Sequence, residues 1–290
     1  MDPILLITQG LNGLQLGVML FLMAAGLTLI FGIMNLINLA HGSLYMIGAY
    51  LAATLQRYTG SFLLAVLLAI PATILIGMLV EVIALRTLYA RDHLDQVLAT
   101  FALILFFNEL VRIIWGPQAY FMALPAALSG HVTVLPGVPY PTYRLLIVVV
   151  GLGVAAFLYL LITRTRLGML IRAGASNREM VNALGVNIQL LYTLLFGLGA
   201  ALAGLAGMMA GPILSVEVGM GESILILTFV VIVIGGIGSI RGAFIAALLV
   251  GVADTFGRIL LPPALASMVI YILMAAVLCW RPQGLFPAHV

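Results

Sequence analysis

Long apolar segments separated by short polar connections run through the whole chain. No Asp, Glu, Lys or Arg occurs between Asp2 and Arg57, an interval long enough for two membrane crossings of about 20 residues each. Charge-free stretches that end at helix-breaking residues predict about nine membrane-spanning helices, with a range of eight to ten. Their approximate bounds are 9–32, 35–55, 62–85, 97–115, 145–163, 188–210, 224–238, 243–261 and 264–280. The first two are joined by almost nothing and the seventh is short, which is compatible with broken or re-entrant helices near 32–43 and 235–242.

The composition agrees with a membrane protein of many spans. Of 290 residues, 64% are hydrophobic and 7% are charged, against about 45–50% and about 25% in soluble domains. We therefore expect an all-α, polytopic helical bundle in which residues 1–290 form one transmembrane domain within a lipid bilayer. Small residues recur every four positions in two predicted helices, a spacing that lets helix backbones approach closely. These residues are Gly199, Ala203, Gly207 and Gly211, and Ala243, Ala247 and Gly251.

The distribution of arginine predicts the orientation. The connection 164–187 holds Arg164, Arg166, Arg172 and Arg178, and short cytoplasmic loops are enriched in basic residues. Placing this connection inside puts the N-terminus outside and the C-terminus inside. Asp2 and the segments 116–142 and 217–222 then lie outside. The same alternation places Arg86, Arg91, Arg241 and Arg281 inside and leaves Arg57, Arg144 and Arg258 toward the outer side.

Several kinds of chemistry are excluded by missing residue types. All twelve basic residues are arginine, so the chain can form neither a lysine-containing phosphate loop nor a lysine Schiff base. The single Cys279 allows no internal disulfide, and the four histidines lie far apart in the sequence. We expect no metal, no cofactor and no enzymatic activity, because no nucleophile, base or metal ligands cluster. Any ATP-driven step would need an ATP site on another chain.

The cytoplasmic connection 164–187 contains signals for a short helix. Ser176 and Glu179 are three residues apart, as in a capping box, and Gly185 supplies a stop. A helix of about two turns is marginal alone in water, so its apolar face is a candidate for a groove on a partner protein. The alternative is a helix that lies on the membrane surface. The expected apolar face consists of Met180, Val181 and Leu184.

Three motifs occur in the order expected for one transporter family, over a matching chain length. They are G-L-T-L-I-F-G-I-M-N-L-I-N-L-A-H-G-S-L-Y-M-I-G-A-Y (Gly26 to Tyr50), R-A-G-A-S-N-R-E-M-V-N-A-L-G-V-N (Arg172 to Asn187) and G-G-I-G-S-I-R-G-A (Gly235 to Ala243). Over essentially its whole length, the chain resembles permease subunits of branched-chain amino-acid ABC importers.

This resemblance implies a multi-pass protein of the bacterial plasma (inner) membrane that forms part of a pathway for branched-chain or related amino acids. Its implied partners are a second related permease, two cytoplasmic ATP-binding subunits and a periplasmic substrate-binding protein, with no nucleic acid. The segment 172–187 becomes the loop that couples to the ATPase. The residues expected in this coupling site are Arg172, Ser176, Arg178, Glu179, Met180, Val181, Leu184 and Gly185.

The second predicted helix supplies the best candidates for the pathway. Polar side chains in a membrane helix usually face the bundle interior or a cavity; the alternative is a set of hydrogen bonds to neighbouring helices. If this helix is broken near 35–43, its freed amides could receive a substrate carboxylate. The candidates are Asn35, Asn38, Gly42 and Tyr45, spaced three, four and three apart along one helical face, with His41 bordering it.

Three other features receive structural interpretations. Gly235-Gly236-Ile237-Gly238 predicts a tight turn or a discontinuous span, because Arg241 stands where a nucleotide fingerprint needs glycine. Asp254 with Arg258, and Glu109 with Arg112, are expected to form ion pairs along helices. The proline-rich, uncharged segment 116–142 cannot be a continuous helix, and we expect a partly extended external loop.

The main alternative function is an ion-coupled secondary transporter of small amphipathic solutes. Such a transporter would carry unpaired carboxylates in its membrane helices and recognisable inverted repeats, and neither is evident in the sequence. The substrate stays open at this point, since related permeases could carry urea, short amides or other amino acids.

Overall fold

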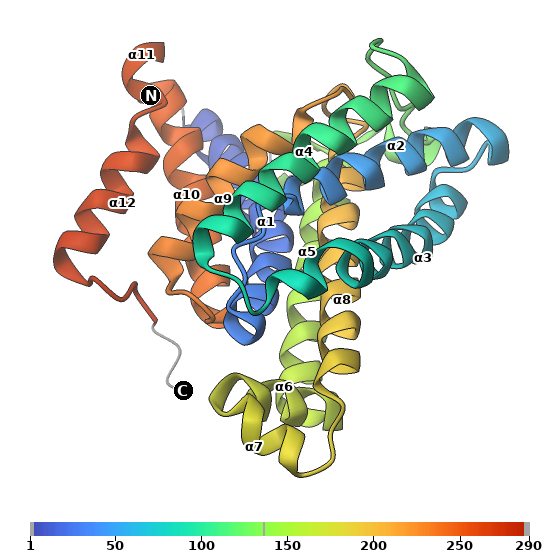
Figure 1. The fold of residues 1–290 in the computed structure, drawn as a ribbon. Helices are drawn as coiled ribbons and strands as arrows, with labels where there is room; N and C mark the ends of the chain where they lie inside the picture. The colour runs from blue at the N-terminus through green and yellow to red at the C-terminus, as the bar shows by residue number, and fades with distance from the viewer. Residues whose placement is uncertain (1–2, 136, 287–290) are drawn as a thin grey trace.

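Helices form most of the computed structural model, which describes residues 3–135 and 137–286 (Figure 1). The described residues do not include Asp2, which the sequence predicts to lie on the outer side of the membrane, nor Pro136 and the C-terminal residues 287–290. The elements are α1 (Pro3–Met34), α2 (His41–Thr59), α3 (Phe62–Val80), the π-helix η1 (Glu81–Leu85), the 3-10 helices η2 (Arg86–Leu88) and η3 (Ala126–Leu128), α4 (His93–Trp115), β1 (His131–Leu135), β2 (Val138–Pro141), α5 (Thr142–Arg164), α6 (Arg166–Ser176), α7 (Arg178–Ala183), α8 (Ile188–Ala210), α9 (Met220–Gly235), α10 (Ile240–Leu260), α11 (Pro263–Ala266) and α12 (Val269–Trp280).

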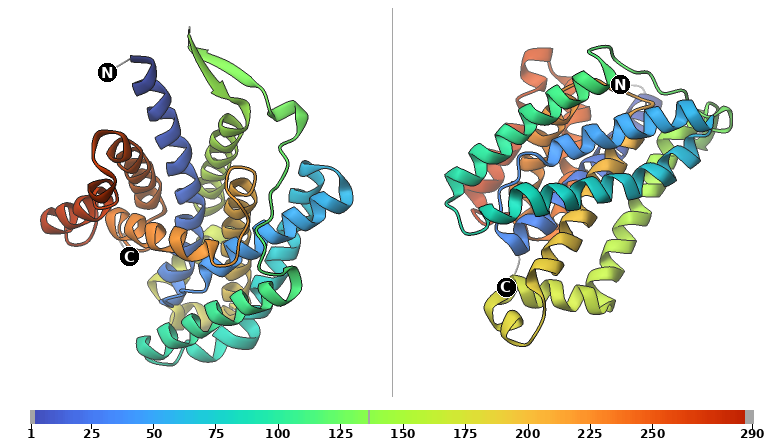
Figure 2. Two further views of the ribbon diagram at one scale, coloured as in Figure 1. Left: turned by 90° about the horizontal axis from the view of Figure 1, so that it is seen from above. Right: turned by 45° about the vertical axis from the view of Figure 1, so that its right-hand side comes forward.

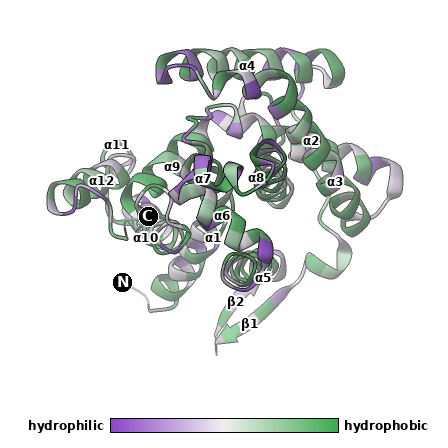
Figure 3. Ribbon diagram, turned by 60° about the horizontal axis from the view of Figure 1, so that its bottom comes forward, coloured by the Kyte–Doolittle hydropathy of each residue, from purple (hydrophilic) through white to green (hydrophobic). Residues whose placement is uncertain are grey.

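Six helices of the described chain are long and apolar enough to cross a membrane, namely α1, α3 with its η1 and η2 extension, α4, α5, α8 and α10. Helices α9 and α12 are apolar but shorter, and each of the nine predicted segments overlaps at least one helix. The prediction of an all-α, polytopic membrane protein is confirmed, apart from the small β1–β2 hairpin. Figure 3, which brings the α6–α7 end forward, shows hydrophobic positions along most of the length of the long helices.

Helices α1 and α8 lie at the centre of the bundle. In its most apolar window, α1 is 83% buried and α8 is 67% buried, against 22% for α4 and for α5. Helices α2, α3 and α4 are inclined across α8 rather than aligned with it (Figure 2). Large apolar side chains on α3, α4 and α5 are exposed, as expected for surfaces in contact with lipid or with another subunit.

Small residues permit the closest helix crossings, as their spacing predicted. A Cβ on Gly251 of α10 would collide with the backbone of α1 at Gly13 and Gly17, and one on Gly207 of α8 would collide with the Tyr45 carbonyl of α2. Because backbone atoms cannot rotate away as side chains do, these crossings require glycine.

The described chain has two distinct ends. At one end, Asn12 of α1 accepts hydrogen bonds from Tyr140 of β2 (3.2 Å) and Arg144 of α5 (2.6 Å). Helix α5 then runs 23 residues, about 35 Å, to α6 and α7 at the other end (Figure 1). The C-terminal segment returns to this second end, where the Leu285 N–H donates to the Ile234 carbonyl (2.8 Å).

The segment 116–142 is partly extended, as predicted. It contains η3 and the antiparallel β1–β2 hairpin, in which His131 lies opposite Pro141. Tyr120 and Val216 exchange two backbone hydrogen bonds of 2.8 and 2.9 Å, which tie this segment to the connection after α8. The glycine-rich segment after α9 is the predicted tight turn, because Gly236 (φ 101°) and Gly238 (φ 82°) adopt left-handed conformations that favour glycine.

Glu81, Glu109 and Asp254 of the membrane helices form ion pairs. The side chain of Glu81, in the π-helix η1, is fully buried and accepts hydrogen bonds from Arg86 (3.2 Å), Tyr89 (2.7 Å) and Thr193 (2.6 Å). Burial, together with the bond to Glu81, raises the pKa of Tyr89 well above its ordinary value, which keeps the hydroxyl protonated as a donor. The predicted ion pairs are also present, Asp254 with Arg258 (2.8 Å) and Glu109 with Arg112 (2.7 Å).

Candidate functional site

The connection between α1 and α2 folds back into the bundle. Helix α1 continues to Met34, Asn35 takes a left-handed conformation (φ 51°), and α2 starts at His41. The His41 ring packs against Gly26 of α1, where an added Cβ would lie 3.0 Å from Nε2. Gly26 precedes the end of α1 by about 12 Å, so α2 begins inside the bundle. The sequence correctly identified 32–43 as a break.

The prediction that Asn35 and Asn38 lie on the polar face of a continuous second helix is wrong, because both residues precede α2. Asn35 is exposed and lines a groove with Ser176 and Arg178 at the α6–α7 end. The remaining candidates are buried in the interior: Asn38, His41, Gly42 and Tyr45.

Asn38 and His41 bring polar atoms to the interior without pairing them. Both side chains are 0% exposed. Within the described residues, neither the Asn38 amide group nor either His41 ring nitrogen forms a hydrogen bond, although the Met23 backbone lies beside the ring. Each unsatisfied buried polar group costs about 1–3 kcal/mol. The alternative reading, hydrogen bonds to neighbouring helices, is therefore not seen for Asn38, whereas for His41 the Met23 backbone of α1 lies within reach of the ring. Orphaned groups such as the Asn38 amide are expected where water or a solute binds.

A second helix begins beside the start of α2. After α8 ends at Ala210, the connection 211–219 leads back to α9, whose Gly221 crosses α2 at Gly42. A Cβ on Gly42 would lie 2.5 Å from the Gly221 carbonyl oxygen. The N-terminal ends of α2 and α9 thus meet, and each end carries the positive partial charge of its helix dipole.

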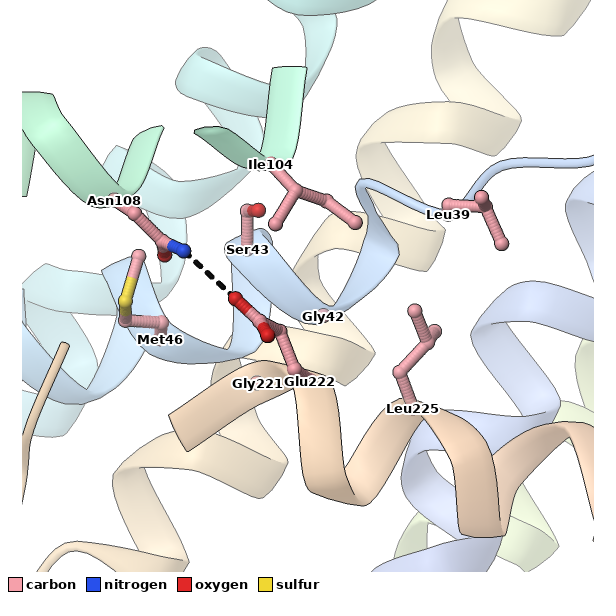
Figure 4. Close-up of a pocket in the computed structure, with 9 residues that line it drawn as sticks. All are labelled: Leu39, Gly42, Ser43, Met46, Ile104, Asn108, Gly221, Glu222 and Leu225. Carbon is pink, nitrogen blue, oxygen red and sulfur yellow. Dashed lines mark hydrogen bonds between the residues drawn. The ribbon is translucent and has the colours of Figure 1, made fainter. Parts of the chain in front are cut away.

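A small pocket lies at this crossing (Figure 4). Asn108 of α4 donates a hydrogen bond to Glu222 of α9 (2.7 Å) across its opening. Its volume is about 10 Å³, enough for one water molecule, so the crossing is closed in this conformation. The pocket is lined by Leu39, Gly42, Ser43, Met46, Ile104, Asn108, Gly221, Glu222 and Leu225.

Sequence reasoning missed Gly221, Glu222 and Asn108. It assigned Glu222 to the loop 217–222, but this residue stands in the first turn of α9. The signal available in the sequence was the shortness of the seventh segment together with the glycine just before it, because short, glycine-interrupted helices mark binding sites in other transporters. In the structure this glycine, Gly219, has φ 86°.

The helix predicted in the connection 164–187 is present as α7, but its predicted start was wrong. Ser176 is the last residue of α6, and Asn177 caps α7 by accepting a hydrogen bond from the Met180 N–H (2.9 Å). Asn177 is extended (φ −152°, ψ 93°), the conformation an N-cap requires, whereas Ser176 is helical. The predicted stop is confirmed, because Gly185 has φ 88° and donates to the Asn182 carbonyl (3.0 Å).

The apolar face of α7 is divided. Met180 (58% exposed) and Leu184 (76%) point outward, but Val181 is only 6% exposed and packs inward. Arg178 and Glu179 line open grooves beside α7. Arg172 lies instead on α6, where its guanidinium donates to the Ile162 carbonyl.

The chain is an apolar helical bundle in which some helices start inside the bundle and one short helix is exposed at one end. This is the architecture of a polytopic membrane permease. Residues 10–278 match the family described as "Branched-chain amino acid transport system / permease component". The chain belongs to this family.

Characterised relatives align with almost the whole chain. It is 35% identical to the high-affinity branched-chain amino acid transport system permease protein BraD of Pseudomonas aeruginosa, over 96% of this chain and 94% of BraD. It is 30% identical to the corresponding protein LivH of Escherichia coli, over 96% and 94% of the two chains. A probable branched-chain amino acid transport permease protein of Methanocaldococcus jannaschii is 27% identical, over 92% and 88%. No solved structure matches the chain.

Proposed function

We propose that this chain forms part of the translocation pathway for branched-chain amino acids in an ATP-driven importer of the bacterial plasma (inner) membrane. The family match over nearly the whole chain carries the proposal. The importer would also contain a second related permease, two cytoplasmic ATP-binding subunits and a periplasmic substrate-binding protein. ATP hydrolysis would occur on the ATP-binding subunits, since the chain has no lysine for a phosphate loop.

The proposed topology has nine spans, the N-terminus outside and the C-terminus inside. The arginines support it, because basic residues concentrate on the cytoplasmic side. Four arginines belong to helix ends or turns on the hairpin side, including Arg112, which the sequence count left out. They are Arg57, Arg112, Arg144 and Arg258. The other eight belong to connections or helix ends on the α6–α7 side: Arg86, Arg91, Arg164, Arg166, Arg172, Arg178, Arg241 and Arg281.

Helix α7 is the proposed contact with an ATP-binding subunit. It projects at one edge of the molecule (Figure 1) and exposes Met180 and Leu184, whereas Val181 anchors it to the bundle. An exposed apolar pair on a capped helix fits a groove on a soluble partner. Ser176, Arg178, Glu179 and Gly185 would contribute through the polar rim and the shape of the loop.

Substitution of Leu184 by Asp tests this contact. A carboxylate buried without a partner costs about 3 kcal/mol or more, equivalent to binding weakened more than about 100-fold. The variant should insert into the membrane but fail both to retain the ATP-binding subunits in mild detergent and to take up substrate.

Two matched variants interpret the result. Leu184→Met keeps the apolar contact and should behave as the native chain, and Asn182→Asp adds the same charge at a polar position of α7 and should retain most binding. If Leu184→Asp keeps its partner and transports normally, α7 is a membrane-surface helix instead. A native chain that purifies without any ATP-binding subunit would favour the secondary-transporter alternative.

A further inference from the structure

A large cavity lies between α1, α5, α6 and the start of α10, apart from the Gly42–Gly221 crossing. Its volume is about 890 Å³. Tyr159 on α5 and Arg241 on α10 line it and are exposed, so the cavity is open at the surface of the helical bundle.

The lining of this cavity is amphipathic. Apolar side chains, among them Phe21, Ala155 and Phe244, line the part nearer the middle of the helices. The part at the α6–α7 end also carries the two cationic side chains of the lining, Arg172 of α6 and Arg241, in the first turn of α10. The change from apolar to cationic lining therefore follows the direction from the membrane interior toward the water boundary.

The two arginines are not neutralised by acids. Neither Arg172 nor Arg241 belongs to an ion pair among the described residues, and no Asp or Glu lines the cavity in that part of the chain. The Arg241 guanidinium lies 5.7 Å from the centre of the Tyr159 ring, an arrangement that holds the cation beside the opening. Arg172 uses one donor on the Ile162 carbonyl and retains others for a ligand.

A buried polar atom in the same cavity also lacks a partner. Thr28 of α1 lines the cavity and is 1% exposed. Its hydroxyl forms no hydrogen bond within the described residues, although a helical threonine usually bonds the carbonyl four residues earlier. The hydroxyl has almost no accessible surface, so the contacts of a bound ligand rest on the two arginines and the apolar lining.

We propose that this cavity binds an anionic phospholipid, with the phosphate between Arg172 and Arg241 and an acyl chain along the apolar part. Basic pockets between membrane helices on the cytoplasmic side bind acidic lipid headgroups. An amino acid fits less well, because its ammonium group would find two cations and no carboxylate. The proposal does not depend on the substrate of the permease.

Native mass spectrometry of the delipidated full chain tests the site with three probes. Phosphatidylglycerol should bind more tightly than phosphatidylcholine with the same acyl chains, and glycerol 3-phosphate should not compete. The double variant Arg172→Gln/Arg241→Gln should bind phosphatidylglycerol about 30-fold more weakly, since each arginine near an acidic lipid contributes about 1 kcal/mol and 1.4 kcal/mol corresponds to tenfold.

Two further variants make the test specific. Arg57→Gln removes an arginine that also lies over a tyrosine ring (Tyr120, 5.6 Å) but at the other end, and should leave lipid binding unchanged. Ala155→Phe fills the apolar part and should weaken binding with both arginines present. The proposal would be overturned by equal binding of the two lipids or by displacement of the lipid by glycerol 3-phosphate. It would also be overturned if Arg57→Gln lost as much phosphatidylglycerol binding as the double variant, or if the double variant bound this lipid unchanged.

Discussion

Substitution of Gly42 by Ala should separate α2 from α9 at the point where their N-terminal ends meet. The new Cβ would lie 2.5 Å from the Gly221 carbonyl oxygen and 2.9 Å from its carbon. Because both atoms are backbone, no change of rotamer relieves the contact. Restoring an ordinary separation of about 3.4 Å requires a movement of roughly 0.9 Å, and overpacking of this kind costs about 1–3 kcal/mol.

The cost is reduced by the higher helix propensity of alanine, about 0.5–1 kcal/mol, which leaves a net loss of stability of about 1–2 kcal/mol. The thermal unfolding temperature in detergent should fall by a few degrees. Uptake should fall by more than this loss of stability alone would cause, because Asn38 and His41 move with the start of α2.

Gly153 of α5 provides the matched control, because an added Cβ there meets no atom within 4 Å. Gly153→Ala should leave uptake unchanged and raise stability slightly. The reasoning fails if Gly42→Ala matches Gly153→Ala in both unfolding temperature and uptake. The reciprocal variant Gly221→Ala, which meets the Gly42 carbonyl, should reproduce the defect.

Two other predictions concern buried polar groups. The substitutions Asn38→Leu and His41→Leu should each reduce the uptake of radiolabelled leucine while leaving assembly of the transporter intact. Normal uptake by both variants would show that these side chains are not part of the pathway. Tyr89→Phe deletes a hydrogen bond to the buried Glu81 carboxylate and should cost about 1.5–3 kcal/mol. The same change in a Glu81→Gln background should cost only about 0.5–1.5 kcal/mol, and equal costs in thermal unfolding would show that the charge is not involved.

Most of the fold could be predicted because its determinants are local in sequence. Apolar length located the helices, small-residue spacing located the Gly207 and Gly251 crossings, and positive-φ glycines such as Gly185 marked turns. The start of α7 was missed by one residue because Ser176 and Asn177 are both good caps. Only the packing of α6, which keeps Ser176 helical, selects Asn177.

The candidate site was predicted only in part, because its arrangement depends on contacts distant in sequence. Helical spacing placed Asn35 with Asn38, but the return of 35–40 along α1 sends Asn35 to the α6–α7 end and Asn38 to the interior. Similarly, helical periodicity grouped Val181 with Leu184 but could not show which side of α7 faces the bundle. The partnership of Gly42 with Gly221 joins positions far apart in the chain and has no local signature.

Helix α9 connects the two candidate sites physically. Its first turn crosses α2 at Gly42, and its last residue, Gly235, accepts a hydrogen bond from the Phe286 N–H (3.0 Å) and packs against Gly242. The turn that follows shares a groove with 174–179 at the α6–α7 end. Backbone contacts at both ends of a 16-residue helix leave little slack, and packed interiors transmit displacement. In the proposed importer, a displacement of the turn 236–239 at the α6–α7 end would therefore reach the Gly42–Gly221 crossing through this one short helix.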